Sequence, residues 1–548
     1  MTRDVHRIFL AALSFSTLAL SACGGGGSST VSASPIVPPS VTLVRVSEAS
    51  PYPSTCGGDL GGSTSYENAE VEPYLAINPA NPSNLIGIWQ QDRWSDGGSH
   101  GLVAGYSLDD GKTWTEKTLL FSRCAGGNSG NGGNYARASD PWVTFSKNGA
   151  AYAISISFDG VTLAPGSDGS VLVSRSADGG ATWSNPTTLV YSGDTAFNDK
   201  ESITADPTNS NYVYAVWDQL TASGFGATHF ARTTNGTSAT PTWETEKIIY
   251  DPAFDNQTIG NEVVVEQDGT LLDVFEEVDN TSSSAASGKI RVIRSIDQGA
   301  TWSTPITVAD NFAVGTVDPD TGAHVRTGAG LPQMAAGPGQ MLVVVWQDGR
   351  FSGGAFDGIA TSRSVDGGLH WSAPVEINGD RGVEAFTPSV AVLGDGTIGV
   401  SYFDFRANTS DPNTLPTEYW FTSSIDGVNW REQHVTGPFD LDEAPVAEGL
   451  FLGDYQAIGV IGSAFVPFFV QTTGLGTADR TDAYFRPAAP QPLVLTRRIS
   501  NQAVQAGNAP PSDAFRRKVH ANLMQLLRNE IPNWDQIRAM RQGTTAPP

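Results

Sequence analysis

Short apolar strands recur along most of the chain, and turn residues bound each of them. Residues 72–78 read Glu-Pro-Tyr-Leu-Ala-Ile-Asn and lead into the apolar run 85–90, and residues 140–143 lead in the same way into 151–154. Alternating and near-continuous apolar runs of this length are typical of β-strands buried between layers. Further pairs of runs begin near residues 200, 262, 332, 388 and 454. The pattern predicts seven inner β-hairpins and an all-β fold.

A second pattern repeats between these hairpins: a Ser, an Asp two positions later, a Gly and then a Trp. The near-complete copies contain Asp109, Asp178, Asp297 and Asp366, and a shortened copy contains Asp426. A degenerate copy with Asn235 reaches its Trp243 only after an insertion. In such a turn the Asp accepts backbone N–H bonds, the Gly supplies a positive φ and the Trp packs below. A period of this length predicts repeated four-stranded units.

These copies are similar to the Asp-box, or BNR, repeat of the sialidase-like β-propellers. The resemblance covers roughly residues 65–487 and implies boxes that join the outer two strands of each blade, opposite an active site. It also implies that the box aspartates are structural rather than catalytic. Sialidase catalytic domains of this family have six blades, whereas the hairpins here predict seven, with six as the alternative.

The two ends of the repeat region predict how it closes. Residues 482–485 form a third strand of the last blade with no clear fourth strand, while residues 41–46 alternate like a strand before the first blade. We expect this N-terminal strand to pair into the last blade, because that pairing hides an exposed edge. The propeller is therefore expected over residues 40–490.

The tail, residues 491–548, differs in kind, since it holds eight Lys and Arg against three acidic residues. Ser512 can cap a short helix there. The apolar residues that share one face of this helix are Phe515, Val519, Leu523, Leu526 and Leu527. A helix docked on the propeller is one interpretation, and a helix that binds a membrane surface or a partner is the other.

The N-terminus predicts export. Residues 1–22 hold Arg3, Arg7 and an apolar run too short to span a membrane, which is typical of a signal peptide. The run ends in Leu-Ser-Ala before Cys23, which resembles the bacterial lipobox and implies a diacylated Cys23, although a cleaved signal with a chance Cys is the alternative. Residues 23–39 predict a flexible tether. Gly24 in place of Asp implies anchoring to the cell envelope at the outer membrane or cell surface.

Composition narrows the function classes. The net charge of −25 argues against nucleic acid as a partner, because a phosphate-binding surface is basic. Cys56 and Cys124 remain after Cys23 and predict a disulfide in an oxidising compartment, with two free buried thiols as the alternative. His and Cys show no metal-ligand spacing, so we predict no zinc site and assign no metal ligand and no cofactor, and the sequence leaves Ca²⁺ binding open. We expect a monomer.

Candidate chemistry follows from the loops that flank the inner strands. Arg93, Arg350 and Arg406 stand at equivalent exits of three blades. A sialidase uses three arginines to bind a sugar carboxylate, and this resemblance would assign them that role. The remaining roles would go to Asp140 or Glu201 as the acid, Tyr455 as the nucleophile and Glu262 as its base. The alternative is that each arginine forms a salt bridge with its neighbouring Asp, and the family's Arg-Ile-Pro signature is absent.

Three functional classes follow. The first is an exo-acting, sialidase-type glycoside hydrolase that acts on extracellular glycans. The second is a non-catalytic propeller that binds a glycan, a glycoconjugate or a protein, and the third is an envelope scaffold. The Asp-box repeats do not separate these classes, because a fold does not determine a function.

Overall fold

The computed structural model describes most of the chain after residue 41. The described residues are 42–221, 226–253, 256–279, 287–488, 501–502, 504–505, 511–530 and 534–535. The predicted signal peptide, the tether and Cys23 lie outside them, as do parts of the tail. Within the described part of the chain, no helix combines the length and the apolar character that a membrane crossing requires.

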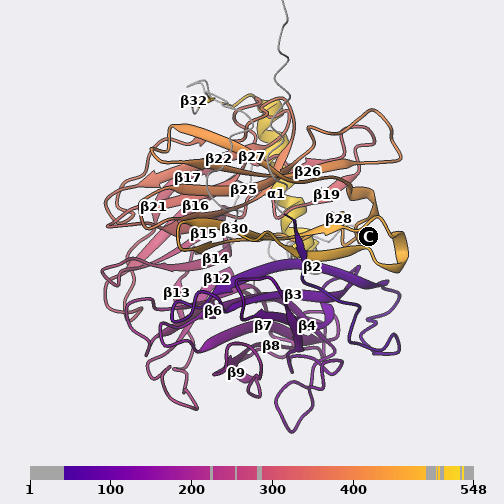
Figure 1. The fold of residues 1–548 in the computed structure, drawn as a ribbon, viewed down its shortest axis with the longest axis vertical. Helices are drawn as coiled ribbons and strands as arrows, with labels where there is room; N and C mark the ends of the chain where they lie inside the picture. The colour runs from indigo at the N-terminus through magenta and orange to yellow at the C-terminus, as the bar shows by residue number, and fades with distance from the viewer. Residues whose placement is uncertain are drawn as a thin grey trace, which may run out of the picture. The chain divides into compact units, whose positions relative to one another are not determined.

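Nearly all regular structure is β, in groups of antiparallel strands that follow one another along the chain (Figure 1). The first groups are β2 (Ser65–Ile77), β3 (Leu85–Trp94), β4 (Ser99–Ser107) and β5 (Thr115–Thr118); β6 (Arg137–Phe145), β7 (Ala151–Asp159), β8 (Asp168–Ser176) and β9 (Thr187–Tyr191); and β10 (Ala196–Ala205), β11 (Val213–Thr221), β12 (Gly226–Thr233) and β13 (Lys247–Tyr250). Each group is a meander in which sequential strands pair.

The later groups repeat this order. They are β14 (Gln257–Val265), β15 (Leu271–Asp279), β16 (Ser287–Ser295) and β17 (Ile306–Asn311); β20 (Gln333–Ala336), β21 (Leu342–Asp348), β22 (Gly358–Ser364) and β23 (Val375–Glu376); β24 (Ala385–Val392), β25 (Ile398–Asp404), β26 (Pro416–Ser424) and β27 (Asn429–Asp440); and β29 (Ala457–Ile461), β30 (Ala464–Thr472) and β31 (Thr481–Phe485). The predicted inner hairpins correspond to the first two strands of each group.

Short elements lie outside this repeat. They are β1 (Val44–Arg45), β18 (Thr316–Val317), β19 (His324–Arg326), η1 (Leu441–Glu443), β28 (Leu450–Phe451), η2 (Gly476–Ala478), β32 (Asn501–Gln502), β33 (Val504–Gln505) and α1 (Asp513–Glu530). Strands β18, β19 and β28 form a small sheet of their own.

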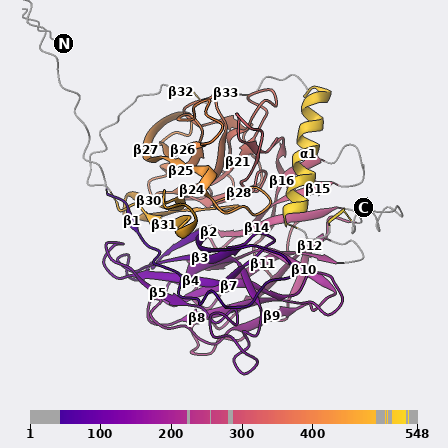
Figure 2. The ribbon, with the colours of Figure 1, turned by 90° about the vertical axis from the view of Figure 1, so that its right-hand side faces the viewer.

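Neighbouring groups touch through their first strands. Contacts link β2 with β6, β6 with β10, β10 with β14, β14 with β20, β20 with β24, β24 with β29, and β29 with β2. Strand β1 pairs antiparallel with β31, so Val44 lies opposite Phe485, as the alternation of residues 41–46 indicated. Figure 2 shows β1 beside β30 and β31. The N-terminal strand therefore adds the fourth strand to the last group.

The hydrophobic core lies between consecutive groups. Strand β21 is buried along its whole length, because one face packs against Leu272 and Val274 of the preceding group and the other against Val400 and Tyr402 of the following one. A strand covered on both faces excludes water only if nearly all of its side chains are apolar. This geometry explains why the sequence shows apolar runs rather than strict alternation.

Each Asp box forms the turn between the third and fourth strands of its group. In the box between β8 and β9, Asp178 accepts hydrogen bonds from the Thr182 N–H (2.9 Å), the Thr182 hydroxyl (2.6 Å) and the Ser176 hydroxyl (2.9 Å). The same bonds recur at Asp109, Asp297 and Asp366, with His370 in the Thr position. Gly180 has φ of 100°, and a Cβ there would lie 2.9 Å from Tyr106 of the preceding group. The Gly is therefore required for conformation and for packing.

Two predicted features of the first group and the tail are found as expected. Cys56 and Cys124 form a disulfide, with Cα atoms 5.7 Å apart, which confirms the predicted pairing. Helix α1 begins after Ser512, whose hydroxyl accepts from the Phe515 N–H at 3.2 Å. The apolar face of α1 is buried against Leu220, Ile259 and neighbouring side chains. Figure 2 shows α1 beside β15 and β16. In this structure the helix is therefore docked against the strand groups, as the first of the two interpretations predicted.

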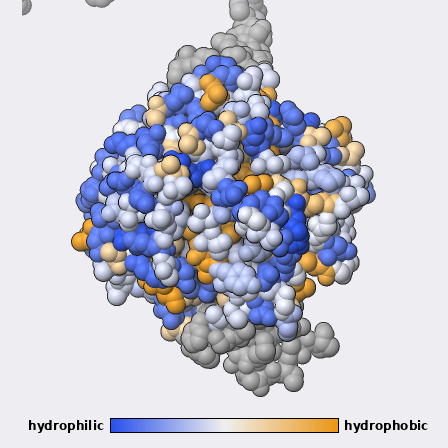
Figure 3. Space-filling view, turned by 90° about the horizontal axis from the view of Figure 1, so that it is seen from below, coloured by the Kyte–Doolittle hydropathy of each residue, from blue (hydrophilic) through white to orange (hydrophobic). Residues whose placement is uncertain are grey.

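Exposed hydrophobic residues are dispersed. On the face drawn in Figure 3, hydrophobic residues lie scattered among hydrophilic ones. Several exposed apolar side chains, such as Leu108, Ile296 and Ile425, occupy the variable position of an Asp box. Singly exposed apolar residues are normal on a protein surface and indicate no site.

Candidate functional site

The first strands of five groups share a break in their pairing. This break turns polar side chains into the region where the groups meet. The pairing register shifts at the same point in β2, β6, β10, β14 and β24. Glu72, Asp140 and Lys200 occupy this point with φ of 55°, 53° and 47°. Non-glycine residues rarely adopt positive φ, and bulges that impose it re-aim side chains next to active sites.

These bulges bring four ionic side chains from four groups together. Lys200 Nζ lies 2.9 Å from Asp454 Oδ2, 3.1 Å from Asp140 Oδ2 and 3.5 Å from Glu72 Oε1. Arg326 of β19 binds Asp454 through Nε (3.2 Å) and Nη2 (2.6 Å). All five side chains are buried. We call this set the axial ion cluster.

Burial and charge act in opposite directions on the acids of this cluster. Burial alone raises the pKa of Asp454, but Arg326 and Lys200 outweigh it and hold that pKa well below its ordinary value. Glu72 has a raised pKa of about 8, because burial and the charge of Asp140 outweigh Lys200. The two cations therefore favour the ionised form of Asp454, whereas burial favours the protonated form of Glu72.

Arg93 lies beside the axial ion cluster without joining it. Its Nη1 donates to Gln90 Oε1 at 2.7 Å, and Gln90 in turn donates to Glu72. Its guanidinium lies 4.9 Å from the ring centre of Phe451, and that of Arg326 lies 4.5 Å from the same ring. Burial and the charge of Arg326 lower the pKa of Arg93. Among the described residues, Arg93 has no ion pair and its Nε has no hydrogen-bond partner.

A cavity of about 250 Å³ opens beside these two arginines. Its polar lining includes Arg93, Asp140, Asp199, Arg326 and Glu448, and its walls include residues 95–98 and 160–162. Arg528 and Asn529 of α1 complete it, and the Asn529 carbonyl accepts from Arg326 at 3.3 Å. We call it the arginine cavity.

A second cavity of about 40 Å³ is lined by Lys200, Glu201, Glu262, Tyr455 and Trp142. The Tyr455 hydroxyl donates to the Pro141 carbonyl at 3.1 Å, and the Trp142 ring packs edge-on to it at 5.3 Å. Burial raises the pKa of Tyr455 and of Glu201 well above the ordinary values, and that of Glu262 to about 8. This cavity has about one sixth of the volume of the arginine cavity, so it is the less suitable of the two for a sugar ring.

The structure divides the predicted catalytic set. Arg93 and Asp140 line the arginine cavity, whereas Glu201, Glu262 and Tyr455 line the small one. Within the described residues Tyr455 makes no hydrogen bond to Glu262, so the expected nucleophile–base pair is not formed. The bulge in β6 leaves the Pro141 carbonyl outside the strand pairing. The Tyr455 hydroxyl donates to this carbonyl instead of to Glu262.

The expectation that three arginines converge is wrong for two of them. Arg350 binds Asp348 through Nε (2.8 Å) and Nη2 (2.7 Å), and Arg406 binds Asp404 and Glu432, at 2.7 Å for the latter. Neither lines the arginine cavity or the small cavity. Both therefore follow the alternative of local salt bridges, because an Asp two positions earlier offers its carboxylate at the strand end.

Arg326 replaces them beside Arg93, and the sequence analysis missed it. It lies in β19, within the long connection between β17 and β20, outside the repeated pattern. Comparison of equivalent blade positions cannot find such a residue. The length of that connection was the one available signal.

Comparisons with known proteins assign this chain to no family. No protein-family model matches the chain, and no curated protein does. The solved structures similar to it include the Hadza microbial sialidase Hz136, at 17% identity and a TM-score of 0.41, where the match covers 61% of this chain and 63% of that one.

Two further similar structures carry ligands. The Penicillium chrysogenum α-L-arabinanase complexed with arabinobiose is 14% identical, with a TM-score of 0.43, and 82% of this chain and 99% of that chain are covered. The Trypanosoma rangeli sialidase in complex with 2,3-difluorosialic acid is 13% identical, with a TM-score of 0.37, and 76% and 53% are covered. This chain thus spans less than two thirds of the length of either sialidase. Similarity at this level assigns no activity.

Proposed function

We propose that this protein is an exported, lipid-anchored, seven-bladed sialidase-like propeller that binds a carboxylate-bearing glycan in the arginine cavity. Seven strand groups and the contacts between their first strands, which return from β29 to β2, support the blade count and the closure. Such a ring collects polar side chains of several blades at its centre, where ligands of small propellers are bound.

The anchor is part of the proposal. The Leu-Ser-Ala-Cys sequence that ends at Cys23 and the disulfide between Cys56 and Cys124 both agree with an exported lipoprotein. Labelled palmitate is expected to enter the wild-type chain and not the Cys23→Ala variant, which should leave the membrane fraction. Equal labelling of both chains would refute the anchor.

Arg93 carries the proposed binding function. It is a buried guanidinium that lines a cavity and has no carboxylate partner among the described residues. A buried cation without an ion pair is unfavourable, and a bound anion would remove that cost. Its planar geometry suits two parallel bonds to a carboxylate, which an uncharged sugar lacks.

Titration calorimetry with the full chain tests this binding. Sialyllactose should release heat and saturate, whereas lactose, which lacks the carboxylate, should not. The Arg93→Gln variant should weaken binding about tenfold or more, since a charge-assisted bond contributes about 1.5–3 kcal/mol. Arg350→Gln is the matched control, because Arg350 lies outside both cavities, and it should bind as the wild type does. Equal loss in both variants, or equal binding of lactose, would refute the proposal.

Hydrolysis is the second candidate function, and one observation favours it. Asp140 lines the arginine cavity and is held by Lys200 and by the Ser139 hydroxyl, so an acid stands within the same space as Arg93. Asp199 supplies a second carboxylate in that lining, as acid-assisted cleavage of a glycoside requires. Fluorogenic sialosides should then be cleaved by the wild type and not by Asp140→Asn, with binding retained. Binding without any turnover by the wild type would leave the non-catalytic function.

A further inference from the structure

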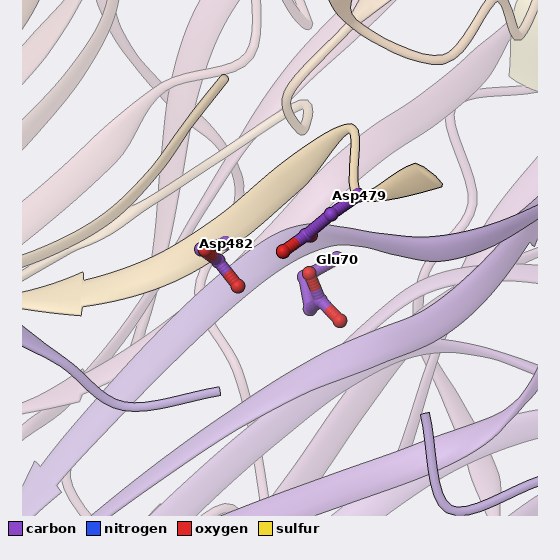
Figure 4. Close-up of side chains that lie close together, drawn as sticks. All are labelled: Glu70, Asp479 and Asp482. Carbon is purple, nitrogen blue, oxygen red and sulfur yellow. The ribbon is translucent and has the colours of Figure 1, made fainter. Parts of the chain in front are cut away.

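Three carboxylates converge where the first and last strand groups meet. Glu70 belongs to β2, Asp482 to β31, and Asp479 follows η2 directly. Figure 4 shows their carboxylate groups pointing toward one another. One oxygen of each lies within 4.8 Å of the others. Because these strands are more than four hundred residues apart in sequence, only the closure of the fold creates this cluster.

The positive charge at this point is insufficient to balance the acids. Arg45 of β1 lies 2.8 Å from Asp482 and 3.2 Å from Asp479, and it is the one cation paired with the cluster among the described residues. Its side chain is 43% exposed. Three carboxylates against one guanidinium leave two uncompensated negative charges when all are ionised, which matches the charge of one divalent cation.

Glu70 belongs to this cluster and has one oxygen without a hydrogen-bond partner among the described residues. Its side chain is fully buried, and Gln91 donates to Oε1 at 2.5 Å, but Oε2 has no partner in the described part of the chain. Oδ1 of Asp479 is also unpartnered there. Buried oxygens of this kind are normally satisfied, so each requires an explanation. Burial and the neighbouring acids raise the pKa of Glu70 well above its ordinary value and that of Asp482 to about 6.

We propose that Glu70, Asp479 and Asp482 bind a Ca²⁺ ion. The Ca²⁺–oxygen distance is about 2.4 Å, so two oxygens of one Ca²⁺ ion lie at most about 4.8 Å apart, and one oxygen from each of the three residues lies within that limit of the others. Gln471 lies directly opposite Asp482 in the register of β30 and β31, and its Oε1 has no partner among the described residues. This amide oxygen adds a neutral ligand of the type that Ca²⁺ accepts. Asp479 is partly exposed, so water can complete the shell.

The ion would fasten the closure of the fold. It would join β2 to the segment that carries Asp479 and β31, beside the contacts that Arg45 of β1 and the Ser47 hydroxyl already make with Asp482. Ca²⁺ is favoured over Mg²⁺, because the ligands are held on separate strands and Mg²⁺ requires six oxygens at about 2.1 Å in a near-ideal octahedron. Because the ion binds the folded chain and not the unfolded one, the stabilisation is expected to grow with the logarithm of the free Ca²⁺ concentration once that concentration exceeds the dissociation constant.

The test uses the full chain after treatment with EDTA. Calorimetry with CaCl₂ should show one Ca²⁺ per chain, and CaCl₂ should raise the melting temperature while MgCl₂ and KCl of equal ionic strength should not. Glu70→Gln should weaken Ca²⁺ binding at least tenfold. Glu276→Gln is the matched control, because Glu276 is an equally buried glutamate of β15 with an unpartnered Oε2, and it should bind as the wild type does.

A second variant keeps the test decisive if Glu70→Gln does not fold. Asp479→Asn changes a more exposed ligand and should show the same loss of Ca²⁺ binding with little change in melting temperature in EDTA. Absence of Ca²⁺ binding by the wild type, equal stabilisation by MgCl₂, or full binding by Asp479→Asn would each overturn the proposal. None of these results depends on the arginine cavity, so the two proposals fail separately.

Discussion

The Asp-box turns and the axial ion cluster use the same acidic residue types with opposite electrostatic results. In the boxes, Asp109 and Asp297 lie close to solvent, and backbone and hydroxyl donors lower the pKa of both to about 2. Burial instead raises the pKa of Glu72, in the axial ion cluster, and of Glu262, in the neighbouring small cavity, to about 8. Burial, neighbouring charges and hydrogen-bond donors, and not the residue type, therefore decide which acids are charged.

The two regions also differ in what assembles them. Each box is complete within one turn, since every donor to Asp178 lies within four residues of it. The axial ion cluster needs strands from four groups and a residue from a long connection. A box should therefore lose little when one bond is removed, whereas the cluster should lose much when one charge is removed.

The largest expected effect is at Lys200. Replacement by Met leaves Asp140 and Asp454 buried with less compensating charge, and breaking a buried ion pair on one side costs about 3–5 kcal/mol. Urea unfolding of Lys200→Met should show this loss. A loss below about 1 kcal/mol would mean that the cluster is hydrated and would remove the contrast with the boxes.

The pH dependence of stability distinguishes the two regions next. The pKa of Glu262 is raised from 4.5 to about 8, so its stabilising neutral form is fully present below pH 4.5 and is lost as the pH rises toward 8. Stability should fall by about 1.4 kcal/mol per pH unit for this group across that window. The melting temperature of Glu262→Gln should therefore decline less between pH 5 and 8 than that of the wild type.

Asp297→Asn is the control for that titration. The pKa of Asp297 is lowered from 3.8 to about 2, so its contribution is present above pH 3.8 and is lost only as the pH falls toward 2. The slope between pH 5 and 8 should match the wild type. A flattened slope in this variant, or an unchanged slope in Glu262→Gln, would contradict the assignment of charges.

Asp178→Ala should have an intermediate effect. It removes three hydrogen bonds at a largely exposed turn, and at 0.5–1.5 kcal/mol each the net loss should be about 1–2 kcal/mol after solvation by water. Asp178→Asn should lose less, because Asn235 makes the equivalent bond to Thr242 N–H at 2.9 Å in the degenerate box. Calorimetric melting of both variants measures this. Loss of sialyllactose binding without loss of stability would instead indicate that the box has a ligand role.

The smallest effect is expected at Lys112. It pairs with Asp110 at 3.0 Å on the surface of a box, and its side chain is 66% exposed. Exposed ion pairs contribute about 0–1 kcal/mol, so Lys112→Met should change stability by less than about 0.5 kcal/mol. This variant is the matched control for Lys200→Met, and an equal loss in both would show that burial is not the cause.

Much of the fold could be predicted from the sequence, but the candidate site could be predicted only in part. The hairpins, the box turns, the disulfide of Cys56 with Cys124 and the cap of α1 by Ser512 depend on contacts between residues near in sequence or on a count of cysteines. Arg93 and Asp140 were also identified, because they occupy repeated blade positions. The same comparison of equivalent positions wrongly predicted that Arg350 and Arg406 converge with Arg93, because side chains at equivalent positions need not point in the same direction.

By itself, the sequence determined the strands, the turns and the order in which they repeat, because alternation, Gly and Asp act within a few residues. Only the tertiary structure decided which charges meet. Arg326 reaches Asp454 across 128 positions, and Glu70 meets Asp482 only because the first and last strand groups touch. The bulges that aim Glu72, Asp140 and Lys200 at one point follow from packing of neighbouring strands. Burial and the neighbouring charges then set the charge of each buried acid, and both are properties of the whole fold.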